Sequence, residues 1–122
     1  MPRVIHFEIF ADRPERVIKF YKEVFGWKIA KWKGPVEYWL VTTGEKSKPG
    51  IDGGIMKRSK KSEATINTVD VPSVDKFIAR IKKKGGEVVS PKMAIPDVGY
   101  MAYCKDTEGN VFGIMHDDPR AK

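Results

Sequence analysis

Polar and hydrophobic residues alternate over residues 5–9 of the first predicted strand, which spans residues 3–11 and is otherwise mostly apolar. His6 and Glu8 lie two residues apart, so in an extended chain their side chains point to the same face of the sheet. The odd-numbered neighbours are apolar and face the other way, where a helix can cover them. This pattern predicts the floor of a pocket that carries an imidazole and a carboxylate. The alternative interpretation is that both are ordinary polar residues on a partly exposed sheet face.

A helical pattern follows the first strand and leads into three further strands. Asp12 is a candidate helix cap, Pro14 suits the first turn, and Gly26 is a typical helix end. Apolar residues recur at helical spacing and predict one stripe that packs on the first strand. The stripe consists of Val17, Phe20, Tyr21, Val24 and Phe25. Strands are predicted at residues 27–33, 37–42 and 53–58, with the aromatic residues Trp32, Tyr38 and Trp39 as core, as a dimer contact or as a wall for a ligand.

The same order of elements then repeats with a period near 60 residues. The predicted elements are a strand at 64–71, a helix that opens at 72–73 and ends at 85–86, a strand at 87–90, a loop at 91–98, and strands at 99–105 and 111–116. Gly54-Ile55-Met56 in the first half matches Gly113-Ile114-Met115 in the second. The repeat predicts an α+β fold of two βαβββ modules in tandem within one domain, residues 1–122. Module 1 covers about 1–59 and module 2 about 62–117, with the curved sheets forming a cup and the helices outside.

Composition narrows the class of protein. The chain of 122 residues carries a formal charge of +7, but its lysines are spread along the sequence, so we expect solvated surface and no nucleic-acid binding. No stretch is apolar enough to span a membrane, and we expect no membrane partner. One cysteine, Cys104, and the lack of a signal-peptide pattern favour a cytoplasmic location. The absence of glutamine beside many lysines and glutamates predicts a thermostable protein.

Several motifs together resemble one known family. They are His6-Phe7-Glu8-Ile9, Asp12-Arg13-Pro14-Glu15-Arg16, Phe20-Tyr21, Val24-Phe25-Gly26-Trp27, Val69-Asp70, Gly85-Gly86, Ile95-Pro96-Asp97-Val98-Gly99 and the run from Asp106 to Gly113. In these motifs the sequence resembles the vicinal oxygen chelate superfamily, the glyoxalase, bleomycin-resistance and dioxygenase group, and within it a small glyoxalase-like branch. The resemblance covers nearly the whole chain and implies paired βαβββ modules, commonly in homodimers.

The resemblance also implies a divalent metal held by the first and last strand of each module, which stabilises an enolate or oxyanion. Carried over residue by residue, the ligand positions fall on His6, Gly54, Ala64 and Gly113. His6 is the one position of the four whose side chain can bind a metal. A divalent metal therefore stays an open expectation, with Glu8 and His116 as the other residues considered.

Two functions follow from these residues. In the first, the protein binds a small organic molecule in the cup without the family's full metal site. By strand alternation the ligand would meet His6 and Glu8 together with Val4, Phe10, Met56, Val111 and Met115. In the second, the protein is a lyase or isomerase in which His6 and Glu8 are catalytic, with or without a metal. The sequence leaves open whether the protein is an enzyme.

Overall fold

The structure is a computed structural model, which describes residues 2–60 and 64–122. The chain forms two compact units, Ile5–Ile66 and Asn67–Lys122 with the N-terminal residues up to Val4. Module 1 denotes the elements from β1 to β4 and module 2 those from β5 to β8. The predicted start of module 2, at about residue 62, lies outside the described residues.

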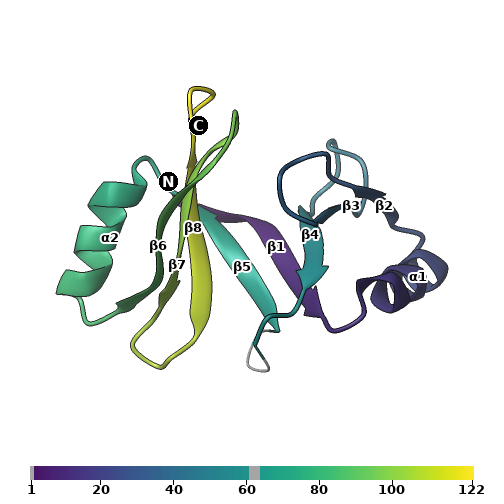
Figure 1. Cartoon of the computed structure of the whole chain (residues 1–122), viewed down its shortest axis with the longest axis horizontal. Helices are drawn as coiled ribbons and strands as arrows, with labels where there is room; N and C mark the ends of the chain where they lie inside the picture. The colour runs from purple at the N-terminus through teal and green to yellow at the C-terminus, as the bar shows by residue number, and fades with distance from the viewer. Residues whose placement is uncertain (1, 61–63) are drawn as a thin grey trace. The chain divides into compact units, whose positions relative to one another are not determined.

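Module 1 has the order β1 (Arg3–Ala11), α1 (Pro14–Phe25), β2 (Lys28–Lys31), β3 (Trp39–Thr42) and β4 (Asp52–Lys57). Its strands lie side by side in the order β2-β3-β4-β1, where β1 and β4 are parallel and the other pairs antiparallel (Figure 1). The parallel pair is separated in sequence by α1 and the β2–β3 hairpin, as a parallel pairing requires. The predicted elements are present, with β2 and β3 shorter than expected.

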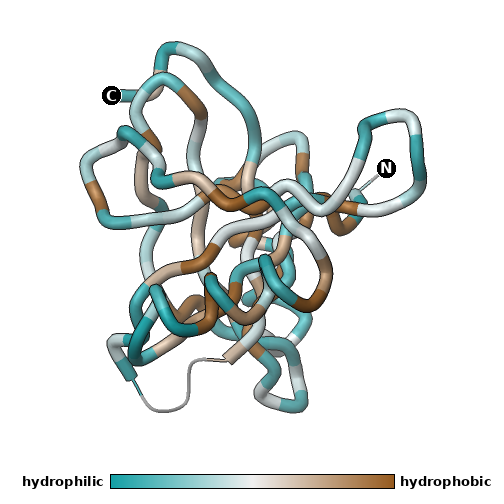
Figure 2. Tube along the Cα trace, turned by 90° about the vertical axis from the view of Figure 1, so that its right-hand side faces the viewer, coloured by the Kyte–Doolittle hydropathy of each residue, from teal (hydrophilic) through white to brown (hydrophobic). Residues whose placement is uncertain are grey.

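Helix α1 covers one face of this sheet. Val17 and Tyr21 pack with Phe7 against a buried cluster that includes Val41 and Ile55. Hydrophobic and hydrophilic residues alternate along the turns of α1 in the foreground of Figure 2, as an amphipathic helix requires. The face of β1 that carries its apolar odd-numbered residues is therefore the face that α1 covers.

Two details of α1 differ from the prediction. The residue that precedes the helix is Arg13, not Asp12, because Pro14 already takes the first helical position, and no side chain caps this end. The predicted stripe is also wider than the buried face, since Phe20, Val24 and Phe25 are each more than half exposed. The side of the helix that packs on the sheet carries Val17, Ile18 and Tyr21.

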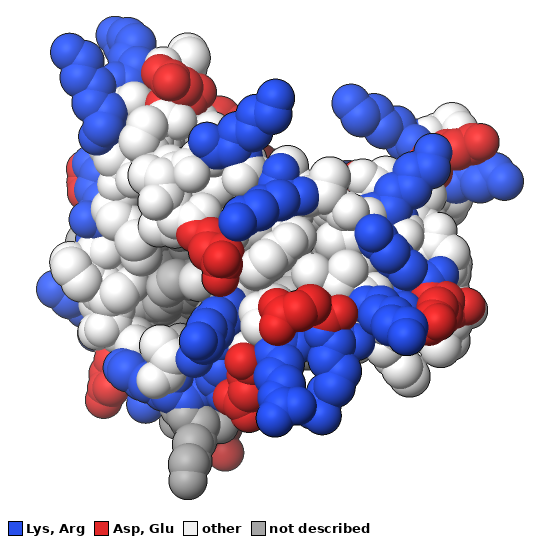
Figure 3. Space-filling view, turned by 45° about the vertical axis from the view of Figure 1, so that its right-hand side comes forward, with Lys and Arg blue, Asp and Glu red and all other residues white. Residues whose placement is uncertain are grey.

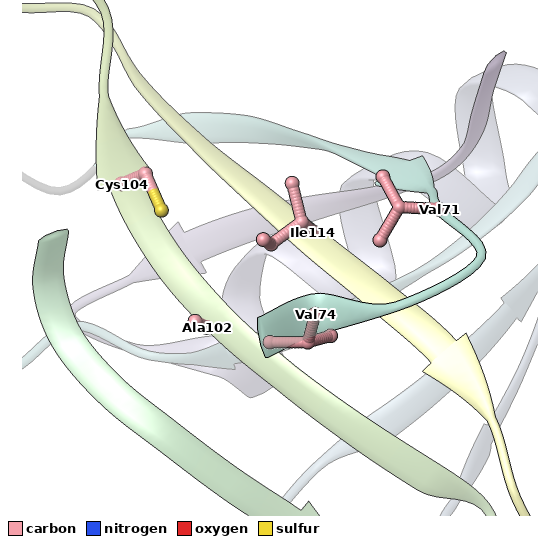
Figure 4. Packing of buried hydrophobic residues seen from close by; sticks show 5 residues of the cluster. All are labelled: Val71, Val74, Ala102, Cys104 and Ile114. Carbon is pink, nitrogen blue, oxygen red and sulfur yellow. The ribbon is translucent and has the colours of Figure 1, made fainter. Parts of the chain in front are cut away.

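Module 2 repeats this plan with β5 (Thr65–Asp70), α2 (Val74–Lys83), β6 (Glu87–Ile95), β7 (Gly99–Lys105) and β8 (Val111–Asp117). Its strands lie in the order β5-β8-β7-β6, with β5 parallel to β8. Five buried side chains form its core, as Figure 4 shows. They are Val71, Val74, Ala102, Cys104 and Ile114. Ser73 caps α2 by accepting a hydrogen bond from the backbone N–H of Lys76 at 3.2 Å.

The loop predicted at 91–98 is wrong for its first half, because β6 continues to Ile95. Pro91 lies where the pairing with β7 shifts register, between Ser90 and Met93. β6 is the last strand of the module 2 order, and irregular pairing at an edge tolerates a proline that cannot donate a hydrogen bond.

Both modules have the βαβββ order, which confirms the predicted α+β fold. None of the helices in the described part of the chain is long and apolar enough to cross a membrane.

Candidate functional site

The register between β1 and β4 arranges one polar face in module 1. His6 lies beside Asp52, Glu8 beside Gly54, and Phe10 beside Met56. Neighbours in a strand pair project to the same side of the sheet. Because α1 covers the side that carries Phe7, this row lies on the side away from the helix. The predicted common orientation of the imidazole and the carboxylate is present in the structure.

Tyr38 connects the two predicted residues. Its hydroxyl donates a hydrogen bond to Glu8 Oε2 at 2.9 Å and lies 2.7 Å from His6 Nε2. A tyrosine hydroxyl has one proton, and Glu8 receives it, so the proton of the His6–Tyr38 bond belongs to Nε2. His6 Nδ1 then carries the free lone pair of the neutral ring. The result is a hydrogen-bonded chain, His6–Tyr38–Glu8, which we call the module 1 triad.

The triad is largely withdrawn from water. Glu8 is 5% exposed, while His6 and Tyr38 are half-buried. Burial lowers the pKa of His6 below its ordinary value of 6.5, although the charges of Glu8 and Asp52 oppose this shift. His6 is therefore neutral at physiological pH, which agrees with the tautomer that the hydrogen bonds require.

Gly54 makes room for Tyr38. A Cβ added at Gly54 would collide with the hydroxyl and the ring of Tyr38. The same glycine pairs with Glu8, so the tyrosine hydroxyl occupies the space beside the carboxylate where a side chain at position 54 would start. The sequence predicted Tyr38 as part of the core, of a dimer contact or of a wall for a ligand, and it did not predict this contact. The available signal was a glycine in the last strand of the module, opposite a buried carboxylate.

Module 2 has a different group at the equivalent place. Thr68 pairs with Gly113 as Glu8 pairs with Gly54, which makes Thr68 the counterpart of Glu8 and Ile66 that of His6. Ala64, the position taken from the family resemblance, precedes β5. Thr68 is buried, and its hydroxyl oxygen has no hydrogen-bond partner among the described residues. A Cβ at Gly113 would lie 2.9 Å from that oxygen.

The other predicted site residues are divided between the two units. Met56 is half-buried beside Phe10 in module 1, and Val111 and Met115 are half-buried on β8 in module 2. Val4 is exposed. Whether these residues bind a ligand stays a prediction.

His116 has a structural contact instead of a partner in the triad. Its Nδ1 accepts a hydrogen bond from the backbone N–H of Val74 at 2.9 Å, at the first residue of α2. The imidazole thus satisfies one of the N–H groups that a helix leaves free at its start.

The family's metal does not fit the residues of this chain. Gly54 and Gly113 offer no ligating side chain, Ile66 and Ala64 offer none, and Nε2 of His6 is engaged by Tyr38. Within residues 2–60 and 64–122, no group of three or more His, Cys, Asp or Glu side chains is arranged to hold a metal ion. Structural zinc or manganese sites need several such ligands at one point.

Comparisons with known proteins agree with this fold. The model of the Glyoxalase/Bleomycin resistance protein/Dioxygenase superfamily matches residues 3–114. A hypothetical protein of Bacillus halodurans C-125 is similar in structure, with a TM-score of 0.74 at 14% identity over 99% of this chain and 98% of that one. A variant methylmalonyl-CoA epimerase of Streptomyces coelicolor in complex with 2-nitronate-propionyl-CoA has a TM-score of 0.71 at 14% identity, over 98% and 97% of the chains. A methylmalonyl-CoA epimerase in complex with methylmalonyl-CoA and NH4+ has a TM-score of 0.72 at 13% identity, over 100% and 99%. At these identities the likeness shows the fold alone, and a search of curated proteins found no match.

Proposed function

Because the chain belongs to the Glyoxalase/Bleomycin resistance protein/Dioxygenase superfamily, we propose that it binds a small organic molecule on the polar face of module 1 without the family's metal. The observation that carries this proposal is the module 1 triad. Tyr38 stands beside Glu8 where a metal-binding side chain at position 54 would begin, and it engages the one predicted ligand, His6. The polar face offers hydrogen bonds, and Phe10 and Met56 continue it with apolar surface. A small number of polar groups surrounded by apolar surface is typical of sites that bind small molecules.

The proposal is tested with a set of small aromatic probes such as phenol and its derivatives. Binding is measured by the NMR shifts of the backbone amides of β1 and β4, which every variant retains. Tyr38→Phe keeps the ring but removes the hydroxyl that holds the triad, so we expect it to weaken binding about fivefold or more. Tyr21→Phe is the matched control, because Tyr21 lies on α1, which covers the opposite face of the sheet. Probes that bind to Tyr38→Phe and to His6→Ala as tightly as to the native protein would contradict the proposal.

Metal analysis provides the second arm of the test. Protein purified without a chelator is expected to contain no stoichiometric divalent metal, and His6→Ala should give the same result. A stoichiometric metal that is lost in His6→Ala would show that His6 is a metal ligand and would refute the metal-free site.

A lyase or isomerase is the second candidate, and the state of His6 favours it. Burial keeps the imidazole neutral, so Nδ1 can accept a proton from a substrate carbon next to a carbonyl. Tyr38 bonds to Nε2 of His6 and is itself held by Glu8, so these two residues fix the orientation of the imidazole ring. Structural neighbours of this fold include methylmalonyl-CoA epimerases. Methylmalonyl-CoA in D2O is the test substrate. Deuterium uptake that is lost in His6→Ala would establish proton transfer by His6, whereas no uptake by the native protein would refute this second candidate.

We further propose that the protein acts as a cytoplasmic homodimer whose partners are small molecules and not nucleic acids. The family resemblance supports the homodimer, and the dispersed lysines argue against a nucleic-acid site. Light scattering after gel filtration measures the molecular mass in solution, and the mass of a single chain would refute the dimer.

We also propose that the protein is thermostable. Its charged, glutamine-free composition supports this, and a melting temperature in the ordinary mesophile range would contradict it.

A further inference from the structure

A pocket of about 600 Å³ opens where β1 ends and α1 begins. It lies entirely within module 1, and its volume is in the range of small-ligand sites, roughly 300–1,000 Å³. Its lining consists of three arginines, one aspartate and four apolar residues: Arg13, Arg16, Arg58, Asp12, Phe10, Ala11, Val17 and Phe20. Lysine and arginine side chains project from many places on the face in Figure 3, with acidic side chains beside some of them. We call the hollow that Arg13, Arg16 and Arg58 line the arginine pocket.

Arg58 is held in place by the end of β1. Its Nη2 donates to the carbonyl of Phe10 at 3.0 Å, and its backbone N–H donates to the carbonyl of Ala11 at 2.8 Å. The side chain is 30% exposed, and its Nε is buried without a hydrogen-bond partner among the described residues. An anchored arginine loses less conformational entropy on binding than a free one.

The charges of the lining favour an anion. Three guanidinium groups face one carboxylate, that of Asp12, which is 3.9 Å from Arg58 and mostly exposed to solvent. Helix α1 begins beside the pocket without a side-chain cap, so the positive end of its dipole adds to the same field. Arginine forks match the oxygen atoms of phosphate and carboxylate groups.

The apolar part of the lining favours an organic anion over an inorganic one. Phe20 is 55% exposed, although the sequence predicted it in the buried stripe, and its ring contacts Tyr21 edge-on at 5.3 Å. Its exposed ring therefore borders the pocket. Such a surface gains free energy when an apolar group covers it.

We propose that the arginine pocket binds a small organic anion, with its phosphate or carboxylate group among the three arginines and its apolar part on Phe20. This site is separate from the module 1 triad and does not depend on the proposed function. Only Phe10, whose carbonyl holds Arg58, belongs to both surfaces.

The probes are phenyl phosphate, benzoate and inorganic phosphate, each titrated into 15N-labelled protein at constant ionic strength. We expect saturable shifts of the backbone amides at the start of α1 and at Arg58, with phenyl phosphate bound more tightly than inorganic phosphate. Tighter binding of phenyl phosphate than of benzoate identifies a phosphate ligand, and the reverse order identifies a carboxylate ligand. No saturable shift with either organic anion would overturn the proposal.

Variants separate the pocket from general charge attraction. Arg16→Ala removes an exposed lining arginine and should raise the Kd of phenyl phosphate about tenfold. Arg120→Ala is the control, since this arginine is 89% exposed and lies in module 2 outside the lining, and its Kd should not change. Phe20→Ser should abolish the preference for phenyl phosphate over inorganic phosphate. An equal loss in Arg16→Ala and Arg120→Ala would mean that net charge alone attracts the anion, which refutes a built site.

Discussion

Gly54 should not tolerate a side chain, because its missing Cβ leaves room for Tyr38. In Gly54→Ala the new Cβ would collide with the hydroxyl and the ring of Tyr38. The ring must move, and the hydrogen bonds to His6 and Glu8 must lengthen or break. Gly44→Ala is the matched control, since a Cβ at Gly44 meets no atom within 4 Å.

The expected cost comes from two sources. Overpacking a fitted site costs about 1–3 kcal/mol, and weakening a hydrogen bond to a buried carboxylate adds about 1–2 kcal/mol. Alanine also restricts the unfolded chain, which returns roughly 0.5–1 kcal/mol. We therefore expect Gly54→Ala to lower the free energy of unfolding by about 3 kcal/mol, and Gly44→Ala to change it by less than about 1 kcal/mol.

A double-mutant cycle assigns this cost to Tyr38. Urea unfolding is measured for Gly54→Ala, Tyr38→Ala and the double variant. Without the tyrosine ring, Gly54→Ala should be nearly neutral, which gives a coupling energy of about 3 kcal/mol. Additive costs, with Gly54→Ala equally destabilising in both backgrounds, would refute the contact between position 54 and Tyr38 and with it the basis of the metal-free site.

Three further predictions follow from buried polar groups. The pKa of His6, measured by NMR, should lie below 6.5, and Asp52→Asn should lower it further because one opposing charge is lost. Since the unfolded chain then binds the proton more readily than the folded chain, the folded state should lose stability as the pH falls below 6.5. A measured pKa above 6.5 would contradict this prediction. Thr68→Val should stabilise the protein by about 1 kcal/mol, because its hydroxyl is buried without a hydrogen-bond partner among the described residues. Thr43→Val should destabilise the protein, since the Thr43 hydroxyl donates to a backbone carbonyl at 2.7 Å. Thermal unfolding of both variants is the test, and equal effects of the two substitutions would refute the prediction. His116→Ala should cost about 1 kcal/mol of unfolding free energy, because the start of α2 loses its acceptor, and unchanged stability would show that the cap contributes nothing.

The duplicated pattern predicted the fold because it depends on local rules. Alternation in β1, Pro14 at the first turn of α1 and the cap at Ser73 each need only neighbouring residues to form. Errors arose where tertiary packing decides. Pro91 indicated a loop, but an edge strand with shifted register accommodates it. Phe20 fits the periodicity of a buried residue, but it is 55% exposed and lines the arginine pocket.

The polar face was half predictable for the same reason. His6 and Glu8 share a face by strand periodicity alone. Tyr38 comes from a segment 30 residues beyond Glu8. The space that it fills arises because the register between β1 and β4 places Gly54 beside Glu8. The arginine pocket combines residues from β1, α1 and the end of β4, which no spacing in the sequence connects.

The hydrogen bonds of the triad define what a ligand must bring to it. Tyr38 donates its only hydroxyl proton to Glu8, and His6 donates its Nε2 proton to Tyr38. The neutral imidazole can therefore only accept a further hydrogen bond, through the lone pair on Nδ1. No described residue bonds to Nδ1, so a ligand that reaches it should carry an O–H or N–H donor. Phenol should therefore bind more tightly than anisole, which has the same ring but no donor, by about fivefold for one hydrogen bond. In His6→Ala the two should bind alike, as measured by competition in the NMR titration. Preference for anisole in the native chain, or a preference for phenol that survives in His6→Ala, would show that the imidazole does not contact the ligand.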